Sequence, residues 1–208
     1  MLTLCVSCSS GAKESAKPAS STTRLVPSTS TSTTTPTTTV ARLPVDAVGT
    51  RRCDTAIFAA PTYEHHPGSQ EIAAGPATFP SLLDGGQNGP IDSQLPDGPA
   101  LIMKNPLTIG NTPARTVRIT ASSPNDAARI VYDDAGLQAL DARTYTFAGN
   151  GVASVDLPGP VSCGQGAGGL VQQNGGFVIL APTCVTLDVF ADGQPAGTAQ
   201  FAAAGGSC

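Results

Sequence analysis

The sequence predicts an all-β protein, an antiparallel β-sandwich of immunoglobulin-like or jelly-roll-like type, from three observations. Short apolar runs are separated by glycine, proline, asparagine and aspartate, and the chain has 23 glycines and 18 prolines in 208 residues. Apolar and polar residues alternate over 115–120 and 184–189, the period of strands that bury one face. Charged residues make up only 12% and aromatic residues 4%, which fits a loop-rich β domain better than a helical one.

Eight short segments fit the strand pattern. They are residues 100–109, 116–120, 128–132, 144–147, 152–157, 176–180, 184–190 and 197–201. Residues 61–99 are rich in glycine and proline and are expected to form a long loop with one short helical turn near 81–84. The glycine-rich run 164–169 is followed by no helix that could bind a pyrophosphate, so we expect a turn there.

Composition divides the chain into three parts. We expect residues 1–8 to be a truncated signal segment, residues 9–43 a linker rich in Ser, Thr and Pro, and residues 44–208 a disulfide-stabilised β-sandwich domain. Residues 28–39 are eleven serines or threonines and one proline, and without apolar side chains to bury they are expected to be disordered. A coil of the linker's length spans roughly 30–35 Å.

Charge is distributed unevenly along the chain. Residues 1–43 have a net charge of +3, whereas residues 44–208 carry 7 basic and 14 acidic side chains. The acidic domain argues against nucleic acid as a partner, because phosphates require a basic surface. The basic linker suits a position near anionic lipid head groups, and an ordinary solvated linker is the alternative.

The N-terminal sequence MLTLCVSCSSG has an apolar start, small residues, Cys8 and a small polar run. It resembles a bacterial lipobox, and the resemblance implies that Cys8 is acylated and anchors the protein to the cell membrane. Cys5 stands where the family usually has leucine, and the basic region and most of the apolar region of a signal peptide are missing. We therefore expect the translation start to lie upstream. Secretion without lipid, or a cytoplasmic protein with a chance match, are the alternatives.

Four cysteines remain for the mature domain: Cys53, Cys163, Cys184 and Cys208. They lack the spacing of a metal site, so we expect two disulfides and an oxidising envelope compartment. Four cysteines allow three connectivities, and the sequence alone does not choose between them. The pairing we expect is Cys163 with Cys184, between neighbouring strands, and Cys53 with Cys208, joining the ends of the domain.

The C-terminal third carries a second resemblance. Its pattern consists of 144–149, 155–157, Cys163, 174–179, 182–189 and 206–208. This pattern is similar to an uncharacterised type of secreted β domain found in high-GC Gram-positive bacteria. The resemblance implies an extracytoplasmic location and a bridge between Cys163 and Cys184, and it supplies no catalytic residue.

Few residues suggest a catalytic or metal site. Glu64, His65 and His66 include both histidines of the chain, so they are weak candidates for Zn²⁺ or Cu²⁺, with Met103 as a further ligand; a solvated loop is the alternative. Asp133 and Asp134 are candidates for calcium or for ordinary turn chemistry. There is no GxSxG motif. We expect no catalytic residue and no cofactor.

These features predict a lipid-anchored cell-envelope protein that acts as a binding or accessory module. Its expected partners are the membrane, through the anchor, and an envelope protein or glycan. Two alternatives remain open at this point. One is a secreted hydrolase of wall polymer or peptide that uses carboxylates, and the other is a metal-handling lipoprotein.

Overall fold

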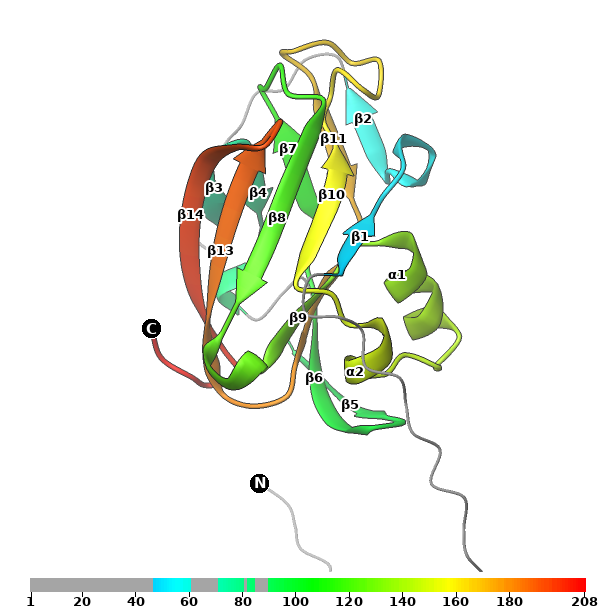
Figure 1. The fold of residues 1–208 in the computed structure, drawn as a ribbon, viewed down its shortest axis with the longest axis vertical. Helices are drawn as coiled ribbons and strands as arrows, with labels where there is room; N and C mark the ends of the chain where they lie inside the picture. Colours follow the sequence, from blue (N-terminus) through cyan, green and yellow to red (C-terminus); the bar gives the residue numbers. More distant parts are fainter. Residues whose placement is uncertain (1–46, 61–70, 81, 85–89) are drawn as a thin grey trace, which may run out of the picture. The chain divides into compact units, whose positions relative to one another are not determined.

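The computed structural model describes residues 47–60, 71–80, 82–84 and 90–208. Within these ranges the chain forms fourteen β-strands in three sheets, two short α-helices and three 3₁₀ turns (Figure 1). All but one of the strand pairings are antiparallel, so the predicted all-β class is confirmed. No helix in these ranges has the length and apolar character of a membrane span. The predicted signal segment 1–8 and linker 9–43 lie outside the described residues.

The first sheet has the strand order β1-β10-β8-β13-β14. Its strands are Val48–Thr50 (β1), Ser154–Pro158 (β10), Thr116–Ser122 (β8), Thr183–Ala191 (β13) and Gln194–Ala203 (β14). The pair β1 and β10 is the parallel one. Buried and half-buried residues alternate along most of β13, so this strand turns one face to the core as its sequence predicted.

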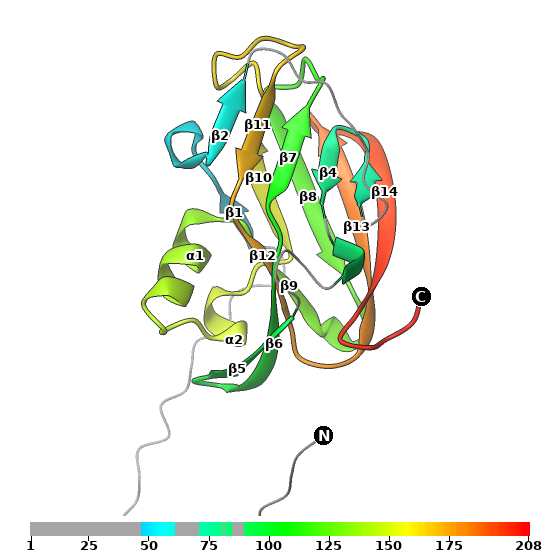
Figure 2. The same cartoon turned by 180° about the vertical axis from the view of Figure 1, so that it is seen from behind.

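The second sheet has the order β2-β11-β7-β4-β3. Its strands are Phe58–Ala60 (β2), Leu170–Gln173 (β11), Leu107–Gly110 (β7), Ala77–Phe79 (β4) and Ile72–Ala74 (β3). It lies behind the first sheet in Figure 1 and in front of it in Figure 2, so the two sheets form a sandwich. At one edge the β3–β4 turn touches β14, where a Cβ on Gly197 would overlap the backbone of Gly75. Only glycine permits this approach.

The third sheet has the order β5-β6-β12-β9. Its strands are Ile91–Leu95 (β5), Gly98–Lys104 (β6), Gly176–Ile179 (β12) and Ala128–Val131 (β9). Strand β6 runs into β7 across residues 105–106, and β11 runs into β12 across 174–175. Between them the Asn105 N–H donates to the Gly175 carbonyl at 2.9 Å. One two-stranded ribbon therefore passes from the second sheet into the third.

Aromatic rings join the three sheets in the main core. The ring centroid of Phe177, from the third sheet, lies 5.1 Å from that of Phe201 in the first and 6.1 Å from that of Phe79 in the second. Tyr132 packs edge-on against Phe177 at 5.9 Å, and its hydroxyl donates to the Asn105 carbonyl at 2.6 Å. This hydrogen bond satisfies the Tyr132 hydroxyl, the one polar group among these four aromatic side chains.

The expectation of one long loop over 61–99 is wrong. Strands β3, β4 and β5 lie within it, and β6 begins there at Gly98. The breakers in this segment mark the tight turns of two hairpins, as the positive φ of Gly75 (57°) and Gly98 (142°) shows. The predicted helical turn is present as the 3₁₀ turn Leu82–Asp84. The other two 3₁₀ turns are Cys53–Thr55 and Pro124–Asp126.

Two further expectations are corrected around the helices. The expected strand 144–147 is wrong, because helix α2 (Phe147–Asn150) begins there and the Thr146 hydroxyl accepts from the Gly149 N–H at 3.0 Å as its cap. Helix α1 (Asp134–Asp141) was not predicted. The expected strand 100–109 is divided into β6 and β7 at residues 105–106, where Pro106 has no N–H to donate to the ladder.

The four expected cysteines form two disulfides, but the expected pairing is wrong. The bridges join Cys53 to Cys163 and Cys184 to Cys208, with Cα–Cα distances of 5.4 and 4.9 Å. Neither the bridge between Cys163 and Cys184 nor the one between Cys53 and Cys208 is present. Two disulfides indicate an oxidising, extracytoplasmic compartment.

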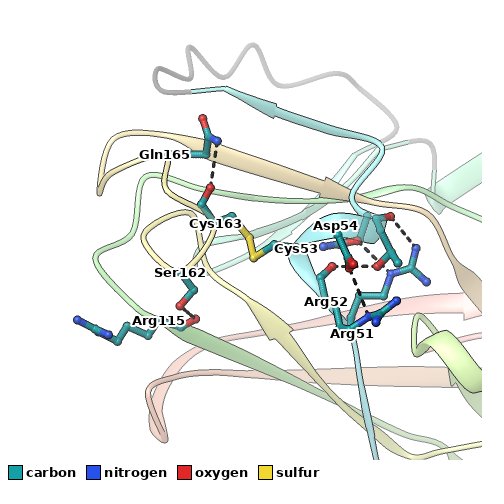
Figure 3. The surroundings of a disulfide bond; sticks show 10 residues. Arg51, Arg52, Cys53, Asp54, Arg115, Ser162, Cys163 and Gln165 are labelled. Atoms are coloured by element: carbon teal, nitrogen blue, oxygen red, sulfur yellow. Dashed lines mark hydrogen bonds and ion pairs between the residues drawn. A yellow bond between two sulfur atoms is a disulfide. The ribbon is translucent and has the colours of Figure 1, made fainter.

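The strand directions explain the correction. The backbone carbonyl of Arg115 accepts from the hydroxyl of Ser162, the neighbour of Cys163 (Figure 3). The backbone N–H of Arg115 donates to the carboxylate of Asp192, the residue after β13, which places Cys163 near that end of the strand. Cys184 lies at the beginning of β13, about 26 Å away along an extended strand. A disulfide requires Cα atoms within about 7 Å, so these two cysteines cannot pair.

The two disulfides are expected to contribute unequally to stability. They close loops of 110 and 24 residues, which correspond to about 5 and about 3.5 kcal/mol in the chain-entropy model. Urea unfolding of the double variants C53S/C163S and C184S/C208S should show the larger loss for the first. A larger loss for C184S/C208S would contradict the expectation, and peptide mapping of the unreduced wild-type protein checks the pairing itself.

Candidate ligand-binding cavity

A cavity of about 440 Å³ lies between one face of the third sheet and helix α1. It sits beside a second, smaller hydrophobic core, separate from the core of the sandwich. The buried members of this second core are Leu95, Ala100, Val131, Tyr145, Phe147 and Val178. The volume of the cavity falls in the range of small-molecule sites.

Cross-strand neighbours build the floor of the cavity. Ile91 of β5 pairs with Ile102 of β6, and Ile102 pairs with Val178 of β12, so the three side chains lie in one row on the same face. Leu137 and Leu140 of α1 line the opposite wall. Ile102 and both leucines are half-buried and Ile91 is 40% exposed. The sheet and the helix therefore leave part of their facing apolar surfaces uncovered.

Two glycines shape the end of the cavity nearest the main core. Gly175 and Gly176 both line it. A Cβ on Gly175 would overlap the ring of Tyr132, and one on Gly176 would overlap the Met103 carbonyl. Side chains at these two positions would force β12 away from its neighbours. The sequence Asn-Gly-Gly at 174–176 thus permits the close approach that forms this wall.

The rim carries the charges. Lys104 at the end of β6, Asp141 at the end of α1 and Arg143 just beyond it all line the cavity and are exposed. Arg143 has φ 59° and donates its N–H to the Leu140 carbonyl at 3.0 Å, a helix-ending conformation for which glycine is usual. The rim therefore has two cations and one carboxylate beside the apolar floor. The uncharged polar residues Ser93, Gln94 and Asn174 also line the cavity.

Tyr145 and Asp133 are two buried polar residues close to the cavity. Tyr145 lines the cavity with 1% of its surface exposed, and neither its hydroxyl nor Oδ1 of Asp133 has a hydrogen-bond partner among the described residues. Burial raises the pKa of Tyr145, and the charge of nearby Asp133 raises it further. The phenol is therefore neutral at physiological pH and adds no charge to the cavity.

Asp133 holds helix α1 in place. Its Oδ2 accepts from the Gly136 N–H at 2.8 Å as the N-cap of α1. Its side chain also packs where a Cβ on Gly49 of β1 would overlap it. Burial raises the pKa of the Asp133 carboxyl, although the Gly136 hydrogen bond and the charge of Arg51 act in the opposite direction.

Arg51 connects helix α1 to both sheets of the sandwich, because it directly follows β1 of the first sheet and contacts β11 of the second. Its guanidinium donates to the Gln173 side chain of β11 at 3.1 Å and to the Thr55 carbonyl at 3.0 Å, and it forms an ion pair with Asp134 of α1 at 3.3 Å. The Arg51 side chain is only 6% exposed, and burial lowers its pKa. Figure 3 shows Arg51 close to the bridge between Cys53 and Cys163. This network positions the cavity wall.

Of the residues singled out from the sequence as site candidates, Met103 is the one that lines the cavity among the described residues. Glu64, His65, His66 and Cys8 lie outside the described residues. Asp133 and Asp134 serve as a helix cap and an ion-pair partner. No group of three or more His, Cys, Asp or Glu side chains converges within the part of the chain that the structure describes. Met103 belongs to the main core, is 1% exposed and also lines the cavity, but no cluster of metal-ligating side chains accompanies it among the described residues.

Sequence reasoning missed the helix that closes the cavity, although a signal was present. Asp133 precedes Leu137 and Leu140, which are three residues apart. A capping aspartate followed by apolar residues at this spacing is typical of a short amphipathic helix. Lys104 and Arg143 are 39 positions apart, so only the tertiary structure brings them to one rim.

The buried N-cap should give the protein a distinct pH dependence. Because the pKa of Asp133 is raised in the folded state, its contribution to stability is lost as the pH rises from the ordinary aspartate value of 3.8 through the raised value. Asp133→Asn keeps a capping oxygen without a titrating group. Its free energy of unfolding relative to wild type should therefore increase with pH over this interval, as measured by urea unfolding.

Asp133→Ala is the matched control, because it removes both the charge and the cap. It should lower the free energy of unfolding by about 0.5–2 kcal/mol relative to Asp133→Asn at each pH. Equal stabilities of the two variants would contradict the capping role. A difference between wild type and Asp133→Asn that is independent of pH would contradict the raised pKa.

Comparisons of the chain with protein-family models, with curated proteins and with solved structures found no match. The function is therefore inferred from the cavity, its rim and the two disulfides.

Proposed function

We propose that the protein is an extracytoplasmic binding module, anchored to the envelope membrane through lipid on Cys8. The folded domain takes a small, largely apolar ligand into the cavity between the third sheet and α1. The observation that carries this proposal is the cavity of about 440 Å³ with an apolar floor and a polar rim, the usual character of a ligand site. The disulfides support the compartment.

Binding is favoured over the carboxylate-dependent hydrolase. Hydrolysis by two carboxylates requires both in one site. Asp141 is the one carboxylate among the described residues that line the cavity. Several other carboxylates of the described domain serve structure instead: Asp134 and Asp156 pair with arginines, and Asp192 accepts from backbone N–H groups.

The linker suits a module that works near a membrane. Residues 9–43 have the composition of a flexible chain that would span roughly 30–35 Å. Such a tether would hold the domain at the membrane surface while leaving the cavity free to meet small ligands, an envelope protein or a glycan. The basic residues of the linker would favour an anionic lipid surface.

A neutral fluorescent probe tests the binding function. N-phenyl-1-naphthylamine fluoresces more strongly in apolar surroundings, and we expect saturable binding to the full chain at one site. Leu140→Trp places a large ring in the cavity and should abolish this binding. Leu180→Trp is the control, because Leu180 is 45% exposed and does not line the cavity. Absence of saturable binding, or equal binding by both variants, would refute the proposed site.

The anchor is tested separately in cells that produce the protein naturally. Cys8→Ser should move the protein from the membrane fraction to the soluble extracytoplasmic fraction and abolish labelling by a fatty-acid analogue. Cys5→Ser is the control and should leave both membrane association and labelling unchanged. Signal peptidases prefer a small residue before the cysteine that receives the lipid, and Leu4, which precedes Cys5, is bulky. Unchanged membrane association and labelling of Cys8→Ser would refute lipidation at Cys8.

A further inference from the structure

The basic side chains of the domain divide into two groups. Residues 44–208 carry 7 basic and 14 acidic side chains, and all seven basic residues lie in the described ranges. Four form ion pairs with aspartates: Arg51, Arg52, Arg118 and Arg129. The other three, Lys104, Arg115 and Arg143, form no ion pair with a described residue. Two of these three line the cavity.

This placement is unexpected in an acidic domain. Carboxylates outnumber cations two to one, yet three of the seven cations form no ion pair with a described residue. Lys104 comes from the third sheet and Arg143 from the segment after α1, so two different elements bring positive charge to one rim. A depression that is more open to solvent lies on the other face of the third sheet and provides a contrast, since Asp92 is the one charged residue among its described lining residues.

The conformation of Arg143 adds to this observation. Six described non-glycine residues have positive φ, and four of them are asparagine or aspartate, which tolerate this region. Arg143 is one of the two others. Its left-handed backbone costs conformational energy that glycine would avoid, and this arginine is among the residues that line the cavity.

We propose that the ligand is a small amphiphilic anion, with its apolar body in the cavity and its acid group between Lys104 and Arg143. This inference rests on the proposed binding function and names its ligand class. The apolar floor would bind the hydrocarbon part by removing it from water. The two cations would attract a carboxylate, phosphate or sulfate, whereas Asp141 would oppose it.

Competition between matched amphiphiles tests the ligand class. The full chain is loaded with N-phenyl-1-naphthylamine, which is then displaced by decanoate or by the neutral 1-decanol. Lys104→Gln and Arg143→Gln should each weaken decanoate binding about two- to fivefold, the range expected of an exposed charge contact. The affinity for 1-decanol should not change, because it has no charge for either residue to bind.

Two further variants make the test specific. Arg115→Gln removes the third cation without an ion pair, which lies outside the cavity lining, and should leave decanoate binding unchanged. Asp141→Asn removes the opposing charge and should strengthen decanoate binding about twofold. Thermal unfolding midpoints equal to that of wild type would show that each variant is folded.

The outcomes separate the ligand class from the binding function. If the neutral probe binds but decanoate does not displace it, or if decanoate binding is insensitive to Lys104→Gln and Arg143→Gln, the anionic ligand is refuted and the binding function stands. A loss in Arg115→Gln as large as that in Lys104→Gln would refute the rim as the recognition element. If the neutral probe does not bind, both proposals fail.

Discussion

The two-stranded ribbon formed by β7–β11 and β6–β12 is the constraint on which the rest of the structure depends. It begins in the second sheet of the sandwich and continues as the centre of the third sheet, with the strand register unchanged across residues 105–106 and 174–175. Gly175 allows the ribbon to pass the ring of Tyr132, and the Tyr132 hydroxyl binds the Asn105 carbonyl at the same place. Because both strands continue together, the third sheet has a fixed position relative to the sandwich.

Because the third sheet extends beyond the sandwich, its outer face packs in a second hydrophobic core. Its inner face supplies Phe177 and Met103 to the sandwich core, and its outer face carries Ile102 and Val178. Alternation along a strand makes these two faces unavoidable. Among the described residues, α1, α2 and the segment between them pack over the outer face, and both helices are short. The cavity is the part of this second core that the described residues leave unfilled.

Helix α1 therefore shapes the cavity. Its stability comes mainly from contacts with the rest of the domain. It has eight residues, and isolated helices of this length are not stable in water. Its N-terminus is held by the Asp133 cap and by the ion pair between Arg51 and Asp134, and Arg51 in turn contacts β11. The bridge between Cys53 and Cys163 closes the same edge. Structural carboxylates and arginines pair with one another there, while Lys104 and Arg143 do not.

The sequence by itself determined the all-β class, most strands after residue 100 and the four cysteines that form disulfides, because alternation and turn residues are local signals. It did not determine the hairpins within 61–99, whose turns and strands are too short to be told from a loop. The pairing of Cys53 with Cys163 depends on β1 lying parallel to β10, a contact between segments about 100 residues apart. The cavity is likewise a tertiary feature, since Lys104 and Arg143 line the same cavity only after the ribbon and the helix are packed together. Local patterns report which face of a strand is buried, whereas only the packed chain decides which faces meet and what space remains between them.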